Sequence, residues 1–135
     1  PLPPRLLHLI IPAEAILDHA ESVQKLRLAG CRIVLSQVGR DLQIFNSLKA
    51  NMADYLLLDG ELCANVQGNL MDEMLITIIQ GHAQRLGMKT IAGPVVLPLV
   101  MDTLSGIGVD LIYGEVIADA QPLDLLVNSS YFAIN

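Results

Sequence analysis

Short runs of continuous apolar residues alternate with helical patterns along this chain, and this alternation limits the folds that it can adopt. The runs that we expect to form strands are 6–11, 32–35, 55–58, 90–92 and 111–112. Helical spacing is expected over 16–28, 42–48, 71–86 and 99–104. Strands without polar alternation are typical of a parallel sheet buried on both faces. The pattern therefore predicts right-handed βαβ units in an α/β fold.

Two architectures fit five such units. A doubly wound sheet could use five strands, whereas a closed eight-stranded barrel needs roughly 250 residues. The chain has 135 residues, so a barrel would be only about half present. Both architectures place their functional loops at the carboxyl ends of the strands.

The longest helical pattern also predicts which side chains form its apolar face. These are Met71, Met74, Leu75, Ile78, Ile79 and Leu86. We expect Gly87 to end this helix.

Composition excludes several kinds of protein. The net charge is −6 and the basic residues are scattered, which disfavours direct nucleic-acid binding. No apolar run reaches the roughly 18 residues of a membrane span. Cys31 and Cys63 lack the close spacing of a zinc or redox motif, so we interpret both as buried thiols of a cytoplasmic protein. Residues 1–5 resemble no signal peptide and are interpreted as the boundary of a longer chain.

The predicted strand ends carry few acids. Ser36 and Gln37 follow the second strand, Asp59 the third, Gly93 the fourth and Tyr113 the fifth. Metal-assisted hydrolysis needs several hard oxygen ligands around the ion, and Asp59 alone does not supply them. The sequence also lacks a nucleophile elbow, a phosphate-binding loop and a zinc-protease motif.

The order of segments resembles the carboxyl-terminal half of the EAL domain, the barrel-type phosphodiesterase that hydrolyses cyclic di-GMP. The stretches that carry the resemblance are "LHLIIPAEAIL", "RIVLSQVGRD", "ADYLLLDGEL", "TIAGPVVL" and "GVDLIYGEVIADAQPL". Members of the family typically have L-E-I-T-E, R-I-A-L-D-D-F-G-T-G, V-D-Y-L-K-I-D, V-A-E-G-V-E-T and G-C-D-x-x-Q-G-Y in the same order. The resemblance implies a partial TIM-type (β/α) barrel of about five βα units. It also implies one domain portion over 1–135, with a tail at 127–135.

Seven positions depart from these family motifs. Acids, a lysine or a glutamine of the family are replaced at Ile10, Ser36, Gln37, Leu57, Gly93, Val96 and Tyr113. In active members these residues hold two divalent metals or position the attacking water, so the resemblance implies that the magnesium or manganese sites are lost and no cofactor binds. The family residues that remain are interpreted as turns, caps and packing positions: Gly39, Asp54, Tyr55, Asp59, Gly108, Asp110 and Gly114.

The leading hypothesis is therefore a catalytically inactive regulatory domain in cyclic di-GMP signalling. It would bind a protein partner or the rest of its own chain. The composition is 53% apolar, and half a barrel cannot bury so many apolar side chains alone. A homo-oligomer, or the cytoplasmic part of a membrane-anchored chain, is compatible with this hypothesis. The alternative is a non-hydrolysing cyclic di-GMP receptor, with Arg40, Ser36, Gln37 and Tyr113 as candidate ligand-binding residues. At 118–120 the sequence Ala-Asp-Ala stands where the family usually has Ser-Arg-Pro, so an arginine that could bind a phosphate is missing. An active phosphodiesterase and an unrelated receiver-like domain are disfavoured, because the acidic residues that each would need are missing from the strand ends.

Overall fold

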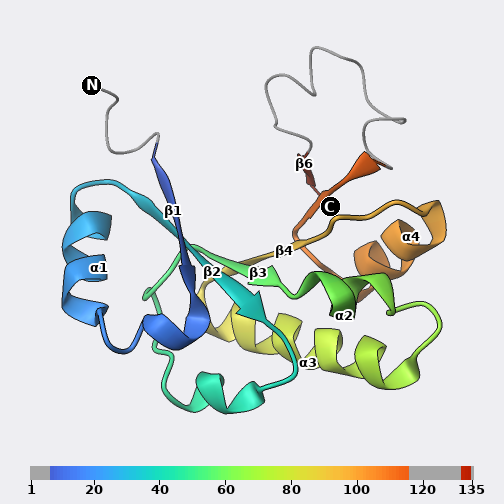
Figure 1. The fold of residues 1–135 in the computed structure, drawn as a ribbon, viewed down its shortest axis with the longest axis horizontal. Coiled ribbons are helices and arrows are strands. Elements are labelled where there is room, and N and C mark those ends of the chain that lie inside the picture. The colour runs from blue at the N-terminus through green and yellow to red at the C-terminus, as the bar shows by residue number, and fades with distance from the viewer. Residues whose placement is uncertain (1–6, 116–131, 135) are drawn as a thin grey trace.

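A single sheet organises the chain (Figure 1), and the computed structural model describes residues 7–115 and 132–134. Its strands are β1 (His8–Pro12), β2 (Arg32–Val38), β3 (Tyr55–Leu58), β4 (Lys89–Ala92), β5 (Leu111–Tyr113) and β6 (Phe132–Ile134). They lie side by side in chain order. The first five strands are parallel, and β6 pairs antiparallel with β5.

Helices connect the parallel strands around one side of the sheet. They are α1 (Ala20–Leu28), α2 (Gly60–Ala64), α3 (Leu70–Leu86) and α4 (Pro98–Ile107), with short 3-10 helices η2 (Ala13–Ala15) and η3 (Leu42–Asn46). A doubly wound sheet reverses its strand order at a switch point, whereas this order runs uninterrupted from β1 to β5. The prediction of a partial TIM-type barrel is therefore confirmed. No helix in the described part of the chain combines the length and apolar character needed to cross a membrane.

The hydrophobic core fills the layer between the sheet and these helices. Ile33 and Leu35 of β2 and Leu56 of β3 are completely buried there, together with Ile76 and Ile79 of α3. On β1 the side chains alternate: Leu9 and Ile11 pack against this core, while Ile10 is 65% exposed. The expectation that the strands are buried on both faces is therefore wrong for β1. Among the described residues β1 pairs only with β2, so it is the edge strand of the sheet.

Local element boundaries differ most from the sequence-based expectation in three places. The helix expected from residue 16 begins at Ala20, after the separate 3-10 turn η2. The second strand continues to Val38, so Ser36 and Gln37 lie within it. The segment 42–48 forms only a five-residue 3-10 helix. The short helix α2 and the strand β6 were not expected. The expectations for 1–5 and 118–120 lie outside the described residues.

The helix α3 ends at Gly87 as its sequence predicts, but it buries only part of the expected apolar face. Asn69 accepts hydrogen bonds from the backbone N–H groups of Met71 and Asp72, and Gly87 ends the helix in a left-handed conformation with φ +72°. The buried residues of this helix are Asp72, Ile76, Ile79, Gln80 and Ala83, and Leu75 and Leu86 pack against the core as expected. Met71, Met74 and Ile78, expected in the core, are exposed. The prediction of the buried face is therefore wrong for these three side chains.

Candidate functional site

The carboxyl ends of the parallel strands meet at one edge of the sheet, which we call the strand-end edge. In βα barrels this edge carries the functional loops. The pairing of β2 with β3 shifts register between Leu35 and Val38. Gln37 lies in this irregularity with φ +61°, a left-handed conformation that is uncommon for a residue other than glycine. The strand-end edge is thus irregular at the place where the family has its aspartate pair.

The structure distributes the seven departing positions over the sheet and its loops. Ser36 is half-buried and pairs with Pro12 of β1, whereas Gln37 is exposed. Leu57 is half-buried and lies in register with Ile91 of β4. Ile10 is exposed, as is Val96 in the connection between β4 and α4.

Gly93 and Tyr113 come into direct contact at this edge. A Cβ atom built on Gly93 would lie 2.6 Å from the ring of Tyr113 and 2.5 Å from its carbonyl oxygen. The Tyr113 ring therefore occupies the space that a side chain at residue 93 would need. Burial, and secondarily the nearby Cys63, raises the pKa of the Tyr113 hydroxyl.

The thiol of Cys63 packs into the same corner from α2. It is completely buried, and burial raises its pKa to about 11, despite a backbone hydrogen bond from Gly93 that acts in the opposite direction. The cysteine is therefore a neutral packing group at neutral pH, because only a thiolate is a strong nucleophile or metal ligand. The sequence indicated its burial, but nothing in the chain order placed it beside Gly93.

Asp59 is the acid that remains at a strand end. It precedes α2 and is half-buried, and a Cβ atom on Gly39 would lie 3.1 Å from the Asp59 Cβ. Gly39 thus allows the loop after β2 to lie against the end of β3. Within the described residues no three His, Cys, Asp or Glu side chains form a group that could hold a metal ion. A phenol, a thiol, an amide and one carboxylate do not fit a pair of divalent metals, which require several hard oxygen ligands.

Arg40 connects the loop after β2 to the first turn of α3. Its guanidinium donates to both carboxylate oxygens of Asp72, at 2.6 and 3.2 Å. The Asp72 side chain is fully buried, while that of Arg40 is 53% exposed. The hydrogen bond from Arg40 lowers the pKa of the Asp72 carboxyl. Sequence reasoning missed Asp72, because an acid in the first turn of a helix is ordinary and its partner lies 32 residues away.

This ion pair predicts a pH-dependent difference between two aspartate variants. Because the folded pKa of Asp72 lies below its ordinary value of 3.8, the pair stabilises the fold above that pH and loses its effect as the pH falls through the folded pKa. We expect Asp72→Asn to lower the urea midpoint at pH 7, and the difference from the unsubstituted chain to shrink at about pH 3. Asp102→Asn, on the exposed face of α4, is the control and should show no such trend. A deficit for Asp72→Asn that is the same at both pH values would contradict this assignment.

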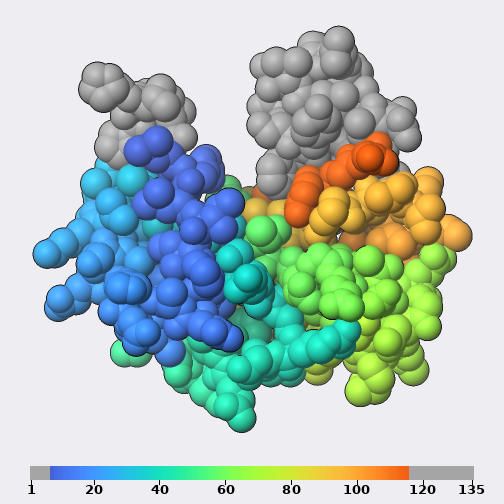
Figure 2. Space-filling view, in the orientation of Figure 1, coloured from blue at the N-terminus to red at the C-terminus, as the bar shows by residue number. Residues whose placement is uncertain are grey.

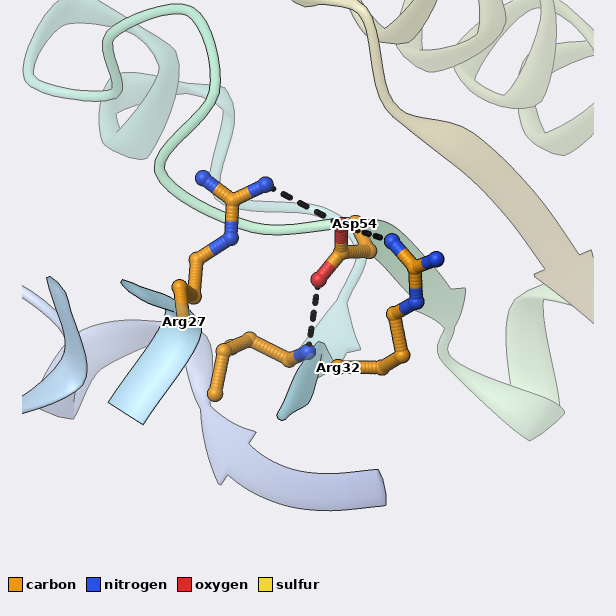
Figure 3. A network of polar contacts seen from close by, with 4 residues as sticks. Arg27, Arg32 and Asp54 are labelled. Carbon is orange, nitrogen blue, oxygen red and sulfur yellow. Dashed lines mark hydrogen bonds and ion pairs between the residues drawn. The ribbon is translucent and has the colours of Figure 1, made fainter. Parts of the chain in front are cut away.

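The opposite edge of the sheet is held by a second polar cluster around Asp54 (Figure 3). Its carboxylate accepts from the backbone N–H of Ile33 at 2.8 Å and from Arg27 at 3.0 Å, and Arg32 lies at 3.5 Å. Burial by itself raises the pKa of Asp54, but the hydrogen bonds from Arg27 and Ile33 and the charges of both arginines outweigh it and lower the pKa. This agrees with the interpretation of Asp54 as a scaffold residue.

Asp110 has a similar structural role between the last parallel strands. Its side chain accepts from the backbone N–H of Thr90 at 2.9 Å, and its own N–H donates to the Thr90 hydroxyl at 3.1 Å. The retained family residues Asp54 and Asp110 therefore bridge neighbouring segments away from the strand-end edge.

Comparison with known proteins gives a family match over most of the chain. A sequence profile of the EAL domain matches residues 1–120. The cyclic di-GMP phosphodiesterase PdeF of Escherichia coli is 28% identical over 102 residues, which cover 76% of this chain and 14% of that protein. The cyclic di-GMP phosphodiesterase PdeB of Shewanella oneidensis is 28% identical over 103 residues, covering 76% of this chain and 12% of that protein. The chain thus spans a small part of these relatives.

Solved structures match the fold. The EAL domain of Xanthomonas citri FimX in complex with c-diGMP superposes with a TM-score of 0.77 at 24% identity, covering 86% of this chain and 47% of that one. The S helix-GGDEF-EAL portion of Vibrio cholerae LapD, bound to c-di-GMP, gives a TM-score of 0.71 at 24% identity, covering 84% and 29%. At this identity the likeness shows the shared fold alone.

Proposed function

Because the chain belongs to the EAL domain family, we propose that it is a non-catalytic regulatory domain of cyclic di-GMP signalling that acts by binding a protein partner. The observation that carries this proposal is the contact between Tyr113 and Gly93, in which an aromatic ring fills the place of a family acid. Ser36, Gln37 and Leu57 likewise replace family residues with groups that neither hold a metal nor activate water. Loss of both magnesium or manganese sites is part of this proposal.

Exposed apolar side chains support a protein as the partner. Val96, Leu97 and Leu99 are each about 60% exposed where β4 connects to α4, and Ile10 is exposed on β1. Exposed apolar groups that cluster are typical of protein interaction surfaces. Val96 and Ile10 are themselves two of the departing positions, so the substitutions exchanged polar groups for apolar surface.

A non-hydrolysing cyclic di-GMP receptor is the alternative function. The half-exposed guanidinium of Arg40 near the strand-end edge favours it, because arginine forks bind phosphate well. However, Arg40 already bonds to both oxygens of the buried Asp72. Turning this arginine toward a phosphate would leave a buried carboxylate without its ion-pair partner, which is strongly unfavourable. We therefore prefer the protein-binding function.

The first experiment combines calorimetric titration of cyclic di-GMP with an assay for its hydrolysis, each with magnesium, with manganese and without metal. We expect neither hydrolysis nor binding heat, because the metal ligands are replaced and Arg40 is engaged. Binding without hydrolysis would support the receptor instead, and metal-dependent hydrolysis would refute both functions. Circular dichroism of the same sample provides the control for folding.

The protein-binding part of the proposal has its own test. Chemical crosslinking of the chain in its native cell extract should be lost after Leu97→Ser and Leu99→Ser together. The matched control is Leu28→Ser, because Leu28 is 78% exposed on α1 and remote in sequence from this patch. Crosslinked species that survive the double substitution would contradict the assignment of this surface.

A further inference from the structure

The helical layer outside β2 and β3 is thin, and this leaves an open groove beside α1. The connection from β2 to β3 forms only the five-residue η3, and α1 begins only at Ala20. Two cavities lie between these segments, of about 380 and about 280 Å³. Both are lined by Leu17 and Ser47, so they are adjacent parts of one groove. In Figures 1 and 2 the blue turn after β1 and the teal segment after β2 border this region.

The floor of the groove is apolar. Ile16, Val23 and Met52 line the larger cavity, and Val38 and Ile44 line the smaller one. Leu17, which borders both, is 44% exposed. Cavities of this size accept apolar side chains of a bound partner, and burial of such side chains supplies most of the affinity of an anchored segment.

The rim of the groove is acidic. Glu21 borders the larger cavity, Glu14 and Asp41 border the smaller one, and all three are exposed. Lys49 is the single basic residue that lines either cavity. Such a rim repels nucleotide phosphates and attracts lysine and arginine. The charge thus selects a cationic occupant.

The groove reaches the strand-end edge through Gln37. This residue lines the smaller cavity, although its backbone lies in the irregular end of β2 with φ +61°. Left-handed conformations at residues other than glycine persist where surrounding structure holds them, and they concentrate at functional sites. An occupant of the smaller cavity would therefore touch Gln37, one of the two residues that stand in place of the family's aspartate pair.

We propose that this groove binds a cationic amphipathic segment of a partner protein, with two apolar side chains in the two cavities and lysine or arginine against Glu14, Glu21 and Asp41. The inference rests on the proposed function in that it specifies the class of partner. The groove lies apart from the Val96, Leu97 and Leu99 patch, since none of these residues lines either cavity.

Fluorescence anisotropy with two labelled model peptides tests the inference. Both peptides carry leucines at i, i+3, i+4 and i+7, and the remaining positions are lysine in one peptide and glutamate in the other. We expect the lysine peptide to bind the 135-residue chain at least about tenfold more tightly, with an affinity that falls as salt is added. Equal affinities, or no binding of the lysine peptide, would overturn the inference.

Matched variants locate the binding. Leu17→Ser and Glu21→Gln should each weaken binding of the lysine peptide, whereas Leu28→Ser, on the same helix as Glu21, and Asp102→Asn on α4 should not. Binding that survives Leu17→Ser unchanged would place the peptide elsewhere and overturn the inference. The two proposals fail separately: hydrolysis of cyclic di-GMP would refute the proposed function without changing the peptide result, and equal peptide affinities would refute only the groove.

Discussion

Gly93→Ala is expected to lower the free energy of unfolding by about 3 kcal/mol or more. The new Cβ atom would meet both the ring and the carbonyl oxygen of Tyr113, and the backbone at residue 93 has φ +155°. Truncating the ring as well, in Gly93→Ala with Tyr113→Ala, should recover only part of the loss because the carbonyl oxygen remains. Urea denaturation followed by circular dichroism measures each value.

Gly106→Ala is the control for this prediction. Gly106 lies within α4, and a Cβ atom there would meet nothing within 4 Å. Alanine should stabilise this exposed helical position by about 0.5–1 kcal/mol. Equal effects of the two glycine substitutions would contradict the close packing at Gly93.

The same site links stability to the proposed function. Gly93→Glu would restore the family's acid, yet we expect no manganese binding by calorimetry, because the side chain has no room beside Tyr113. Manganese binding by a folded Gly93→Glu variant would refute the view that the ring has closed this position.

The second large effect is expected at Asp54, where Asp54→Ala should cost about 3 kcal/mol. The substitution removes the acceptor of the Ile33 N–H and leaves Arg27, which is only 20% exposed, without its carboxylate. Asp54→Asn should cost less, because the amide oxygen still accepts from Ile33 while the charge is lost. Thermal and urea unfolding at pH 7 give these differences.

Asp102→Ala is the matched control for Asp54, because Asp102 is an exposed aspartate on α4. We expect its effect to remain within about 0.5 kcal/mol. If Asp54→Ala were no more destabilising than Asp102→Ala, the cluster in Figure 3 would contribute little to the fold.

The parallel architecture could be predicted because its signals are local. The run Tyr55–Leu58 and the helix stop at Gly87 each lie within or next to one element, so neighbouring residues decide the outcome. The resemblance to the EAL family predicted the partial barrel, and the uninterrupted strand order agrees with this prediction. Element ends were less predictable: β2 extends past Leu35 because Ser36 pairs with Pro12 of β1 and Val38 pairs with Leu58 of β3, and no local pattern records these pairings.

The buried face of α3 shows where local reasoning failed. The helix carries apolar residues around much of its circumference, so hydrophobic spacing could not choose among its faces. The structure buries Asp72 and Gln80, because Arg40 and Thr90 supply their hydrogen bonds from distant segments. Met71, Met74 and Ile78 are left exposed. A buried polar residue usually needs such a partner, and the partner is known only once the chain has folded.

The alternation of strands and helices, the family frame and the replacement of acids at the strand ends could be inferred from the amino-acid sequence, since residue type and spacing encode these directly. The three-dimensional fold was needed to show that Tyr113 closes the space at Gly93, that Arg40 pairs with Asp72, and that Leu17 borders a groove. Each of these pairs or groups joins residues far apart in the chain. Their contacts depend on the sheet register and helix packing, and these arise from the balance of burial and hydrogen bonding over the whole fold.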